Sequence, residues 1–229
     1  MRMRKKPNLV PRMEACSDIW IRNPEELRGK WRKLYPDARE LRLEVGCGKG
    51  KFTAETAAAE PDILLIAMER VPEAMVMAME KVKNMGLTNV FFIGEDVARA
   101  PELFAPGEVD LLYINFCDPW PSNHHARRRL THKNFLVLYR GRLTHQGFLE
   151  LYKKILKPGA EIHFKTDNAA LFDFSLEQFQ LSGYELKNVT HDLHKDGPVG
   201  IMTGYEEKFY GIGTPICRCE AIYREAKDA

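Results

Sequence analysis

Strand and helix patterns alternate along this chain from Leu41 onward, and this alternation constrains the fold more than any other feature. Short apolar runs typical of buried strands are separated by segments with apolar residues at helical spacing. We predict strands at residues 41–47, 63–69, 90–94, 109–116 and 161–165, and helices at 51–59, 72–85, 148–156 and 171–181. Such alternation indicates an α/β, Rossmann-like fold with a doubly wound, mostly parallel sheet. Two later strands, 185–191 and 216–224, allow an antiparallel strand late in the sheet.

The composition fits one large domain with a short basic extension. The chain has 229 residues, of which 45% are apolar, and this is enough for the full core of one α/β domain. We place that domain at residues 41–229 and interpret residues 1–40 as a basic N-terminal arm. The basic start is followed by no apolar stretch, and no apolar run reaches the length of a membrane span. We therefore predict no membrane partner, and the sequence leaves a monomer and a homo-oligomer both open.

The cysteines and histidines predict neither a disulfide framework nor a metal centre. Cys217 and Cys219 are separated by a single residue, which is too few for a zinc knuckle. His191 and His194 lie near Asp192 but have no further ligand beside them in the sequence, so we expect structural or surface histidines. Reduced cysteines fit a cytoplasmic protein.

A glycine-rich loop follows the first predicted strand and contains Gly46, Gly48 and Gly50. Glycine allows the backbone to turn sharply and to approach a ligand closely. A loop of this kind between a strand and a helix is a general place to hold a nucleotide-like cofactor, so we expect these glycines to bind one. The dinucleotide fingerprint requires its third glycine at the position of Lys51, and this difference counts against a nicotinamide cofactor.

Acidic residues lie at the ends of the first four predicted strands: Glu44, Glu69, Asp96 and Asp118. Because the carboxyl ends of parallel strands meet at one edge of a sheet, we expect these side chains to surround one cleft. Glu69 is placed to accept hydrogen bonds from ribose hydroxyls, and Asp96 from an adenine amino group. Several carboxylates would repel a pyrophosphate but suit a cationic adenosine ligand such as S-adenosylmethionine.

The sequence Asp-Pro-Trp-Pro at residues 118–121 is the most informative loop of the chain. Its two prolines restrict the backbone, so Asp118 and Trp120 are held in a stiff, extended segment. A fixed carboxylate beside an exposed indole forms a platform for a flat polar ligand such as a nucleobase. The alternative interpretation is a turn with a surface aromatic.

Positive charge is concentrated in two acid-free stretches, residues 1–12 and 119–149, although the net charge is only +2. The second stretch contains Arg127 and Arg128 and favours a polyanionic partner. Within it, the pattern Arg-Leu-Thr-His-x-x-Phe-Leu at residues 129–136 recurs at residues 142–149, which we interpret as a local tandem duplication. We expect one copy to pack on the sheet and the other to form an extra turn or a protruding basic element.

These motifs together resemble the bacterial tRNA (guanine-N7-)-methyltransferase family, which has a class I methyltransferase fold. The likeness rests on residues 44–50, Glu69, Asp96, 115–121, 128–131, 164–168 and 203–209. The resemblance implies that Glu44, Glu69 and Asp96 bind S-adenosylmethionine and that Asp118 serves both the cofactor and catalysis. It further implies that tRNA is contacted by Asp167, Thr203, Tyr205 and Glu206. The family usually has a basic residue where Ser122 stands, and Arg127 or Arg128 could take its place.

Methyl transfer to guanine N7 fits these residues chemically. N7 carries a free lone pair, so no proton must be removed and the enzyme's task is alignment. The transfer places positive charge on the purine, which the carboxylate of Asp118 can stabilise, and Trp120 can hold a purine exposed from folded RNA. A nicotinamide oxidoreductase and a non-catalytic RNA-binding module are the alternatives. The glycine spacing counts against the first, and the intact Asp118 and glycine loop count against the second.

Overall fold

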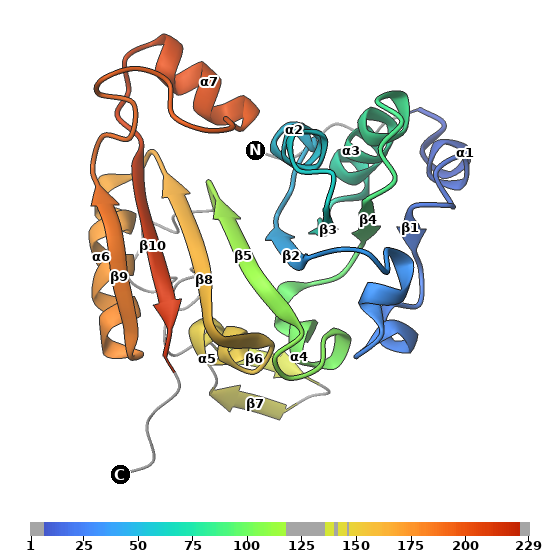
Figure 1. The fold of residues 1–229 in the computed structure, drawn as a ribbon, viewed down its shortest axis with the longest axis horizontal. Coiled ribbons are helices and arrows are strands. Elements are labelled where there is room, and N and C mark those ends of the chain that lie inside the picture. Colours follow the sequence, from blue (N-terminus) through green and yellow to red (C-terminus); the bar gives the residue numbers. More distant parts are fainter. Residues whose placement is uncertain (1–6, 118–135, 140–141, 146, 225–229) are drawn as a thin grey trace.

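The protein is built around an eight-stranded sheet with the strand order β1-β4-β3-β2-β5-β8-β10-β9. This computed structural model describes residues 7–117, 136–139, 142–145 and 147–224 (Figure 1). The strands of the sheet are β1 (Trp20–Ile21), β2 (Glu40–Val45), β3 (Ile63–Met68), β4 (Val90–Ile93), β5 (Val109–Asn115), β8 (Leu156–Thr166), β9 (Tyr184–Thr190) and β10 (Cys217–Tyr223). All neighbouring pairs are parallel except those made by β10, which runs antiparallel to both β8 and β9. The predicted mostly parallel sheet with one late antiparallel strand is therefore confirmed.

Helices cover both faces of the sheet, as the alternating pattern predicts. One face is packed by α1 (Leu9–Glu14), α2 (Lys51–Ala59) and α3 (Pro72–Asn84), whose apolar residues share one core cluster with inward residues of β3 and β4. The other face is packed by α4 (Ala100–Leu103), α5 (Phe148–Lys153) and α6 (Ala169–Leu181), which share the second cluster. Met75 and Met79 of α3 are buried in the first cluster, and Met77 packs against it partly buried. The two buried methionines are core residues that pack at helical spacing.

The described part of the N-terminal arm is integrated into this domain. Strand β1 adds an edge to the sheet by pairing in parallel with β4, and Arg12 of α1 is hydrogen-bonded to Glu80 of α3 at 2.6 Å. The Trp31 side chain is completely buried, and its indole nitrogen donates to the Leu103 carbonyl at 2.8 Å. Two short 3₁₀ turns, η1 (Pro24–Leu27) and η2 (Trp31–Leu34), carry the chain across this end of the domain.

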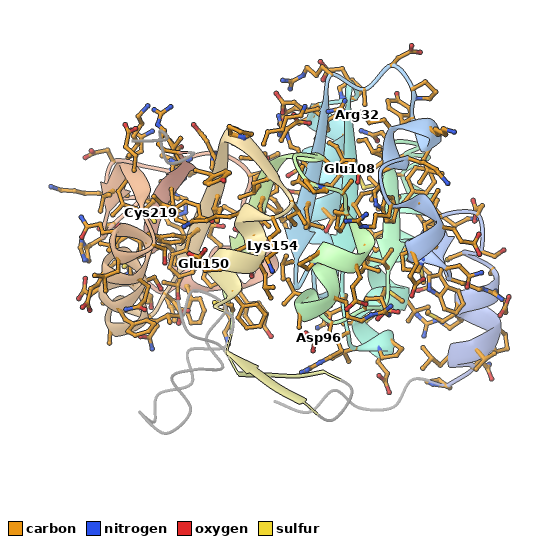
Figure 2. The ribbon with its side chains drawn as sticks, turned by 90° about the horizontal axis from the view of Figure 1, so that it is seen from below. Arg32, Asp96, Glu108, Glu150, Lys154 and Cys219 are labelled. Carbon is orange, nitrogen blue, oxygen red and sulfur yellow. The ribbon has the colours of Figure 1, made fainter. Side chains whose placement is uncertain are left out.

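Polar contacts at and near the surface hold the described part of this segment to the start of β5. The carboxylate of Glu108 accepts from the backbone nitrogens of Gly29 at 2.9 Å and Trp31 at 3.2 Å, and Arg32 is paired with Asp110 at the start of β5. Figure 2 labels Arg32 and Glu108 at this end of the molecule. The sequence pattern missed the segment because its helices and strand are too short for a periodic signal. The division of the chain at residue 40 stays a prediction, and residues 1–6 lie outside the described part.

Two short strands near the junction of the two copies form a hairpin that is separate from the main sheet. Strands β6 (Leu136–Tyr139) and β7 (Arg142–His145) pair only with each other, antiparallel (Figures 1 and 2). The end of the second copy continues into α5, where Phe148, Leu149 and Tyr152 are buried. The prediction that this copy packs on the sheet is confirmed. The first copy lies mostly outside the described residues.

Two element boundaries differ from prediction at the same place. Helix α5 ends at Lys153, and β8 begins at Leu156, earlier than the predicted start at residue 161. The sequence Lys157-Pro-Gly is typical of a helix stop. In the structure these three residues belong to the exposed first part of β8. Helix α7 (Gly204–Gly211) and the four-residue α4 were not predicted as helices. All five cysteines are free, and no helix of the described residues has the length and apolar character needed to cross a membrane.

Candidate cofactor and substrate site

The order of the strands reverses between β2 and β5, and this switch point sets the location of the site. From β2 the chain builds outward to β3 and β4, then returns to β5 on the other side of β2. Ligands of open α/β sheets bind beyond the carboxyl ends of the strands at such a point. Glu44 lies near the end of β2, Glu69 follows β3, Asp96 follows β4 and Asn115 ends β5. The structure therefore brings the three described acids of the prediction to one edge.

The glycine loop meets this edge with three residues in the left-handed region. The φ angles of Gly46, Gly48 and Gly50 are +75°, +57° and +68°. A Cβ atom on Gly50 would lie 2.4 Å from the Cβ of Ala78, so this glycine permits α2 to pack closely on α3. A Cβ atom on Gly46 or Gly48 would meet nothing within 4 Å. Gly50 therefore serves helix packing, while the backbone at the other two glycines is open to a ligand.

Glu69 and Asp96 are held by backbone groups next to them. Glu69 accepts from the backbone nitrogens of Gly48 at 2.9 Å and Val71 at 2.8 Å, so it supports the glycine loop from the next strand. Asp96 caps the 3₁₀ turn η3 (Val97–Arg99) by accepting from Ala98. Each carboxylate oxygen can accept more than one hydrogen bond, so both acids keep acceptor capacity beyond these contacts.

Glu44 is the buried acid of the edge. Burial raises the pKa of its carboxyl to about 7, and the nearby charge of Glu69 adds to this shift, while the Thr53 hydroxyl, the nearby Asn115 amide and the charge of Lys165 oppose it. The hydroxyl of Thr53 donates to Glu44 at 2.5 Å. Although Asn115 lies close enough to affect Glu44, neither of its amide atoms has a hydrogen-bond partner of good geometry among the described residues.

The Asn115 side chain fits a ligand site. The residue is only 8% exposed, and an unpaired amide at this depth costs free energy unless a partner binds it. It lies at the end of β5, in register with Lys165 on β8, at the switch point of the sheet. A polar ligand over the open glycine backbone would supply the missing partner. The residues present therefore fit an adenosine-type cofactor with donors and acceptors on its ribose and base.

A second group of residues lies at the β8 side of the same edge. Helix α7 is placed above the carboxyl ends of β5 and β8 (Figure 1). The carboxylate of Glu206 is fully buried and lies 3.0 Å from the Nζ atom of Lys165 at the end of β8. Tyr205 is 65% exposed, and Asp167 is exposed directly after β8. Thr203 caps α7 through a reciprocal hydrogen-bond pair with Glu206.

Aromatic rings connect the two sides of the edge. Phe116 follows β5 with a φ of +53°, a strained conformation for a bulky residue. Its ring stacks on Tyr205 with centroids 6.5 Å apart and on Phe209 with centroids 6.2 Å apart. The backbone strain thus occurs one residue before Cys117, at the base of the Asp-Pro-Trp-Pro loop. That loop and its predicted site residues, Asp118, Trp120, Arg127 and Arg128, lie outside the described residues.

The histidines near this edge have ordinary polar partners. His191 is paired with Asp173 at 2.8 Å, and His194 with Glu206 at 2.9 Å. One group within the described residues has metal-ligand character, formed by Glu161, His163 and Glu220 on β8 and β10. Arg218 is paired with Glu220 in this group, so a side-chain cation already balances that carboxylate. The ring of His163 also lies against the ring of Tyr113.

Sequence patterns missed several residues of this edge. Lys165, Asn115 and Phe116 were not predicted to have a role, His194 was expected only as a structural or surface histidine, and Lys51 was noted only as a departure from the dinucleotide fingerprint. Lys51 in fact reaches from the start of α2 to α7, where its Nζ atom lies 3.0 Å from Glu207 and 3.2 Å from the Met202 carbonyl. The one available signal was the position of Lys165 and Asn115 at the ends of predicted strands.

The fold is that of class I methyltransferases. Among solved structures, the 16S rRNA methyltransferase KamB superimposes with a TM-score of 0.59 at 14% identity, covering 86% of this chain and 94% of that one. A 16S rRNA (adenine(1408)-N(1))-methyltransferase from Catenulisporales acidiphilia, solved with its cosubstrate SAM, gives a TM-score of 0.57 at 15% identity over 90% and 93% of the two chains. At these identities the likeness shows the fold.

Sequence relatives identify the family. A family model described as "Putative methyltransferase" matches residues 38–152 and 139–219. A tRNA (guanine-N(7)-)-methyltransferase from Halalkalibacterium halodurans is 41% identical over 100% of this chain and 99% of its own length. Enzymes of the same name from Geobacillus kaustophilus and Bacillus subtilis are each 40% identical, over 97% and 98% of this chain respectively. The chain belongs to the tRNA (guanine-N(7)-)-methyltransferase family.

Proposed function

We propose that this protein transfers a methyl group from S-adenosylmethionine to N7 of a guanine in tRNA, acting in the cytoplasm. Relatives that share about 40% of their residues with nearly the whole chain carry this activity in their names. The structural observation that supports it most directly is the edge of the sheet. There, strand-end acids surround an open glycine backbone beside the unpaired, buried amide of Asn115.

We assign the cofactor to the acids and glycines of this edge. Glu69 and Asp96 keep acceptor capacity for the hydroxyl and amino donors of an adenosine, and Gly46 and Gly48 leave room along the loop backbone. The buried carboxylate of Glu44 accepts from the Thr53 hydroxyl. Gly50 contributes by allowing α2 to start close against α3. Asp118 joins this set by its sequence position after β5.

We assign the RNA substrate to the β5 and β8 side. Asp167, Thr203 and Tyr205 lie at the exposed end of β8 and the start of α7, close to the cofactor edge. Trp120, Arg127 and Arg128 follow β5 in the sequence and are assigned to the same side. Glu206 belongs to the same segment, although its carboxylate faces inward in this structure.

The chemistry requires alignment and charge stabilisation. S-adenosylmethionine supplies an electrophilic methyl carbon bonded to a positively charged sulfur. The N7 lone pair forms the new bond as the carbon–sulfur bond breaks, so guanine loses no proton and the protein needs no general base. The purine becomes positively charged, and the carboxylate of Asp118 stabilises that charge as it develops. The remaining residues orient the base and the cofactor.

The direct test is to incubate unmodified tRNA with the protein and methyl-labelled S-adenosylmethionine, followed by nucleoside analysis. We expect label in 7-methylguanosine. Asp118→Asn should lower the rate by an order of magnitude or more while the thermal unfolding transition stays where it is, because the residue acts as an electrostatic stabiliser. Label in another nucleoside, or none at all with tRNA still bound, would contradict the proposal.

A further inference from the structure

Arg70 follows the end of β3 and has a backbone that is fixed on both sides. The backbone nitrogen of Glu69 donates to the Ile93 carbonyl at 3.1 Å, and that of Val71 donates to the Glu69 carboxylate at 2.8 Å. Pro72 then begins α3. The base of the Arg70 side chain therefore has a set position at the cofactor edge, one residue after an acid that we assign to the ribose.

The guanidinium of Arg70 faces the carboxylate oxygen of Asp96 that the backbone leaves open. Oδ1 of Asp96 accepts from the backbone nitrogen of Ala98 at 3.0 Å, whereas Oδ2 lies 3.3 Å from the Nη1 atom of Arg70. The Arg70 and Asp96 side chains are 73% and 46% exposed. An ion pair this exposed contributes little to stability, so another donor can replace the guanidinium at Oδ2 at little cost. Oδ2 is thus the acceptor that is available to an adenine amino group.

A second arginine close to Asp96 is held by other acids. Arg99 ends the 3₁₀ turn that Asp96 caps, and it forms ion pairs with three acids: Glu25, Glu95 and Glu102. By contrast, Asp96 is the one acid with which Arg70 forms an ion pair among the described residues. The Arg70 guanidinium can therefore change its partner when a ligand binds, whereas the Arg99 guanidinium is held by several contacts.

We propose that Arg70 forms one wall of the adenine site, with its guanidinium stacked on the face of the base while Oδ2 of Asp96 accepts from the 6-amino group. The inference rests on the proposed function and adds a cofactor-binding residue to it. A guanidinium is planar and weakly hydrated, so it stacks well on aromatic faces. Arg70 follows β3, which is two strand spacings, roughly 10 Å, from β5. At that separation its charge opposes a sulfonium near the end of β5 only weakly.

Calorimetry with two ligands tests the inference. One ligand is S-adenosylhomocysteine, and the other is its analogue with purine, which lacks the 6-amino group, in place of adenine. Arg70→Ala should weaken the binding of both ligands by the same factor, roughly 5-fold or more, because both keep the aromatic face. Arg70→Lys should recover only part of the loss, since lysine keeps the charge but has no planar face. Arg224→Ala is the matched control: Arg224 is an exposed arginine paired with Glu185, and its removal should leave both affinities unchanged.

Steady-state kinetics give a second measurement on the same variants. Stacking on adenine is equally strong before and during methyl transfer, so Arg70→Ala should raise KM for S-adenosylmethionine and keep kcat within about 2-fold of wild type. The thermal unfolding midpoint should stay at the wild-type value, because the side chain is exposed. A fall in kcat with KM unchanged would contradict a role in binding the base.

Three binding results would overturn the inference. Unchanged affinity in Arg70→Ala would show that the guanidinium does not touch the base, and tighter binding would show that it competes with the base for Asp96. A loss confined to the ligand with the 6-amino group would show that Arg70 acts only through the Asp96 carboxylate. Each of these results leaves the proposed function in place. If the wild-type protein bound neither ligand, the proposed function itself would be contradicted, and the inference with it.

Discussion

The two sides of the ligand edge are held together in different ways. On the cofactor side, Glu69 and Asp96 are fixed by backbone nitrogens, those of Gly48 and Val71 for Glu69 and that of Ala98 for Asp96. On the substrate side, the fixing groups are charged side chains from distant segments. Lys165 and Glu206 are 41 positions apart, and Lys51 reaches a carbonyl 151 positions away.

This difference has consequences for stability and for recognition from sequence. Local backbone contacts recur wherever the same motif folds, so the cofactor side depends on the motif itself. Long-range ion pairs depend on the assembled fold, and a buried pair is costly to break because one charge is left without a partner. We therefore expect substitutions on the substrate side to act on global stability, and substitutions on the cofactor side to act through conformation and protonation.

The largest expected effect is the loss of the buried carboxylate. Glu206→Ala should lower the free energy of unfolding by about 3–5 kcal/mol, because Lys165 would remain buried without a counter-charge. The neighbouring Glu207→Ala breaks only the more exposed pair with Lys51 and should cost less than about 1 kcal/mol. Urea denaturation of the two variants measures both. Equal costs would remove the distinction between the buried and the exposed ion pair.

The second effect concerns the buried carboxyl of Glu44. Burial disfavours the ionised form of this group, so its contribution to stability depends on pH. Its folded pKa of about 7 lies above the ordinary value of 4.5, so the folded state keeps the proton longer than the unfolded state does. The contribution of this group therefore favours folding below about pH 4.5 and declines as pH rises to about 7. The loss amounts to about 3 kcal/mol.

Denaturation of the ligand-free protein at several pH values tests this dependence. Glu44→Gln should flatten the decline between about pH 5 and 7, and Glu40→Gln, on the same strand but half-exposed, should leave it in place. Cofactor donors that favour the ionised form of Glu44 should also make binding release a proton in this range. Calorimetry in two buffers with different ionisation enthalpies would detect that release. A flat profile in the unmodified protein would mean that Glu44 stays ionised.

The same contrast explains what the sequence could predict. The helix at residues 51–59 and the strands around it were predicted closely, because glycine, proline and apolar spacing are local signals. Glu44, Glu69 and Asp96 were placed on one edge for the same reason. The roles of Lys165 and His194 depend on contacts with Glu206 that no local pattern records. Thr203-x-x-Glu206 is a capping-box sequence, yet the burial of its acid goes with contacts to Lys165 and His194, which are distant in the sequence.

Two glycines of the loop allow a smaller test on the cofactor side. Gly50→Ala would place a Cβ atom against Ala78 and force a left-handed residue, so we expect a loss of roughly 2–4 kcal/mol of stability. Gly46→Ala has the same backbone strain but open space, so it should cost roughly 1 kcal/mol. Thermal unfolding measures the stability loss of each variant. Titration with S-adenosylhomocysteine should show weaker binding in Gly46→Ala, although this variant loses little stability. Similar losses in both would indicate that helix packing is not what Gly50 provides.

Salt dependence probes the RNA side outside the described residues. The acid-free stretch that contains Arg127 and Arg128 should neutralise phosphates, so tRNA affinity should fall steeply with salt. Replacing both arginines by alanine should reduce the slope of log affinity against log salt by roughly one for each phosphate that is no longer neutralised. Cofactor affinity should be unaffected. An unchanged slope would place the basic stretch away from the RNA.

The smallest effect is expected from removing the duplicated segment. The two stretches matched by the family model overlap over residues 139–152, which fits a family pattern that contains this segment once. Strands β6 and β7 pair only with each other. The buried residues Phe148 and Tyr152 follow these strands in the sequence and lie outside the deleted segment. Deleting Lys133–His145 joins His132 to Gln146 and restores a single copy. We expect this variant to unfold cooperatively with a midpoint near that of the full chain and to bind S-adenosylhomocysteine normally. A broad or absent transition would show that the hairpin supports α5 and that the duplication has become part of the core.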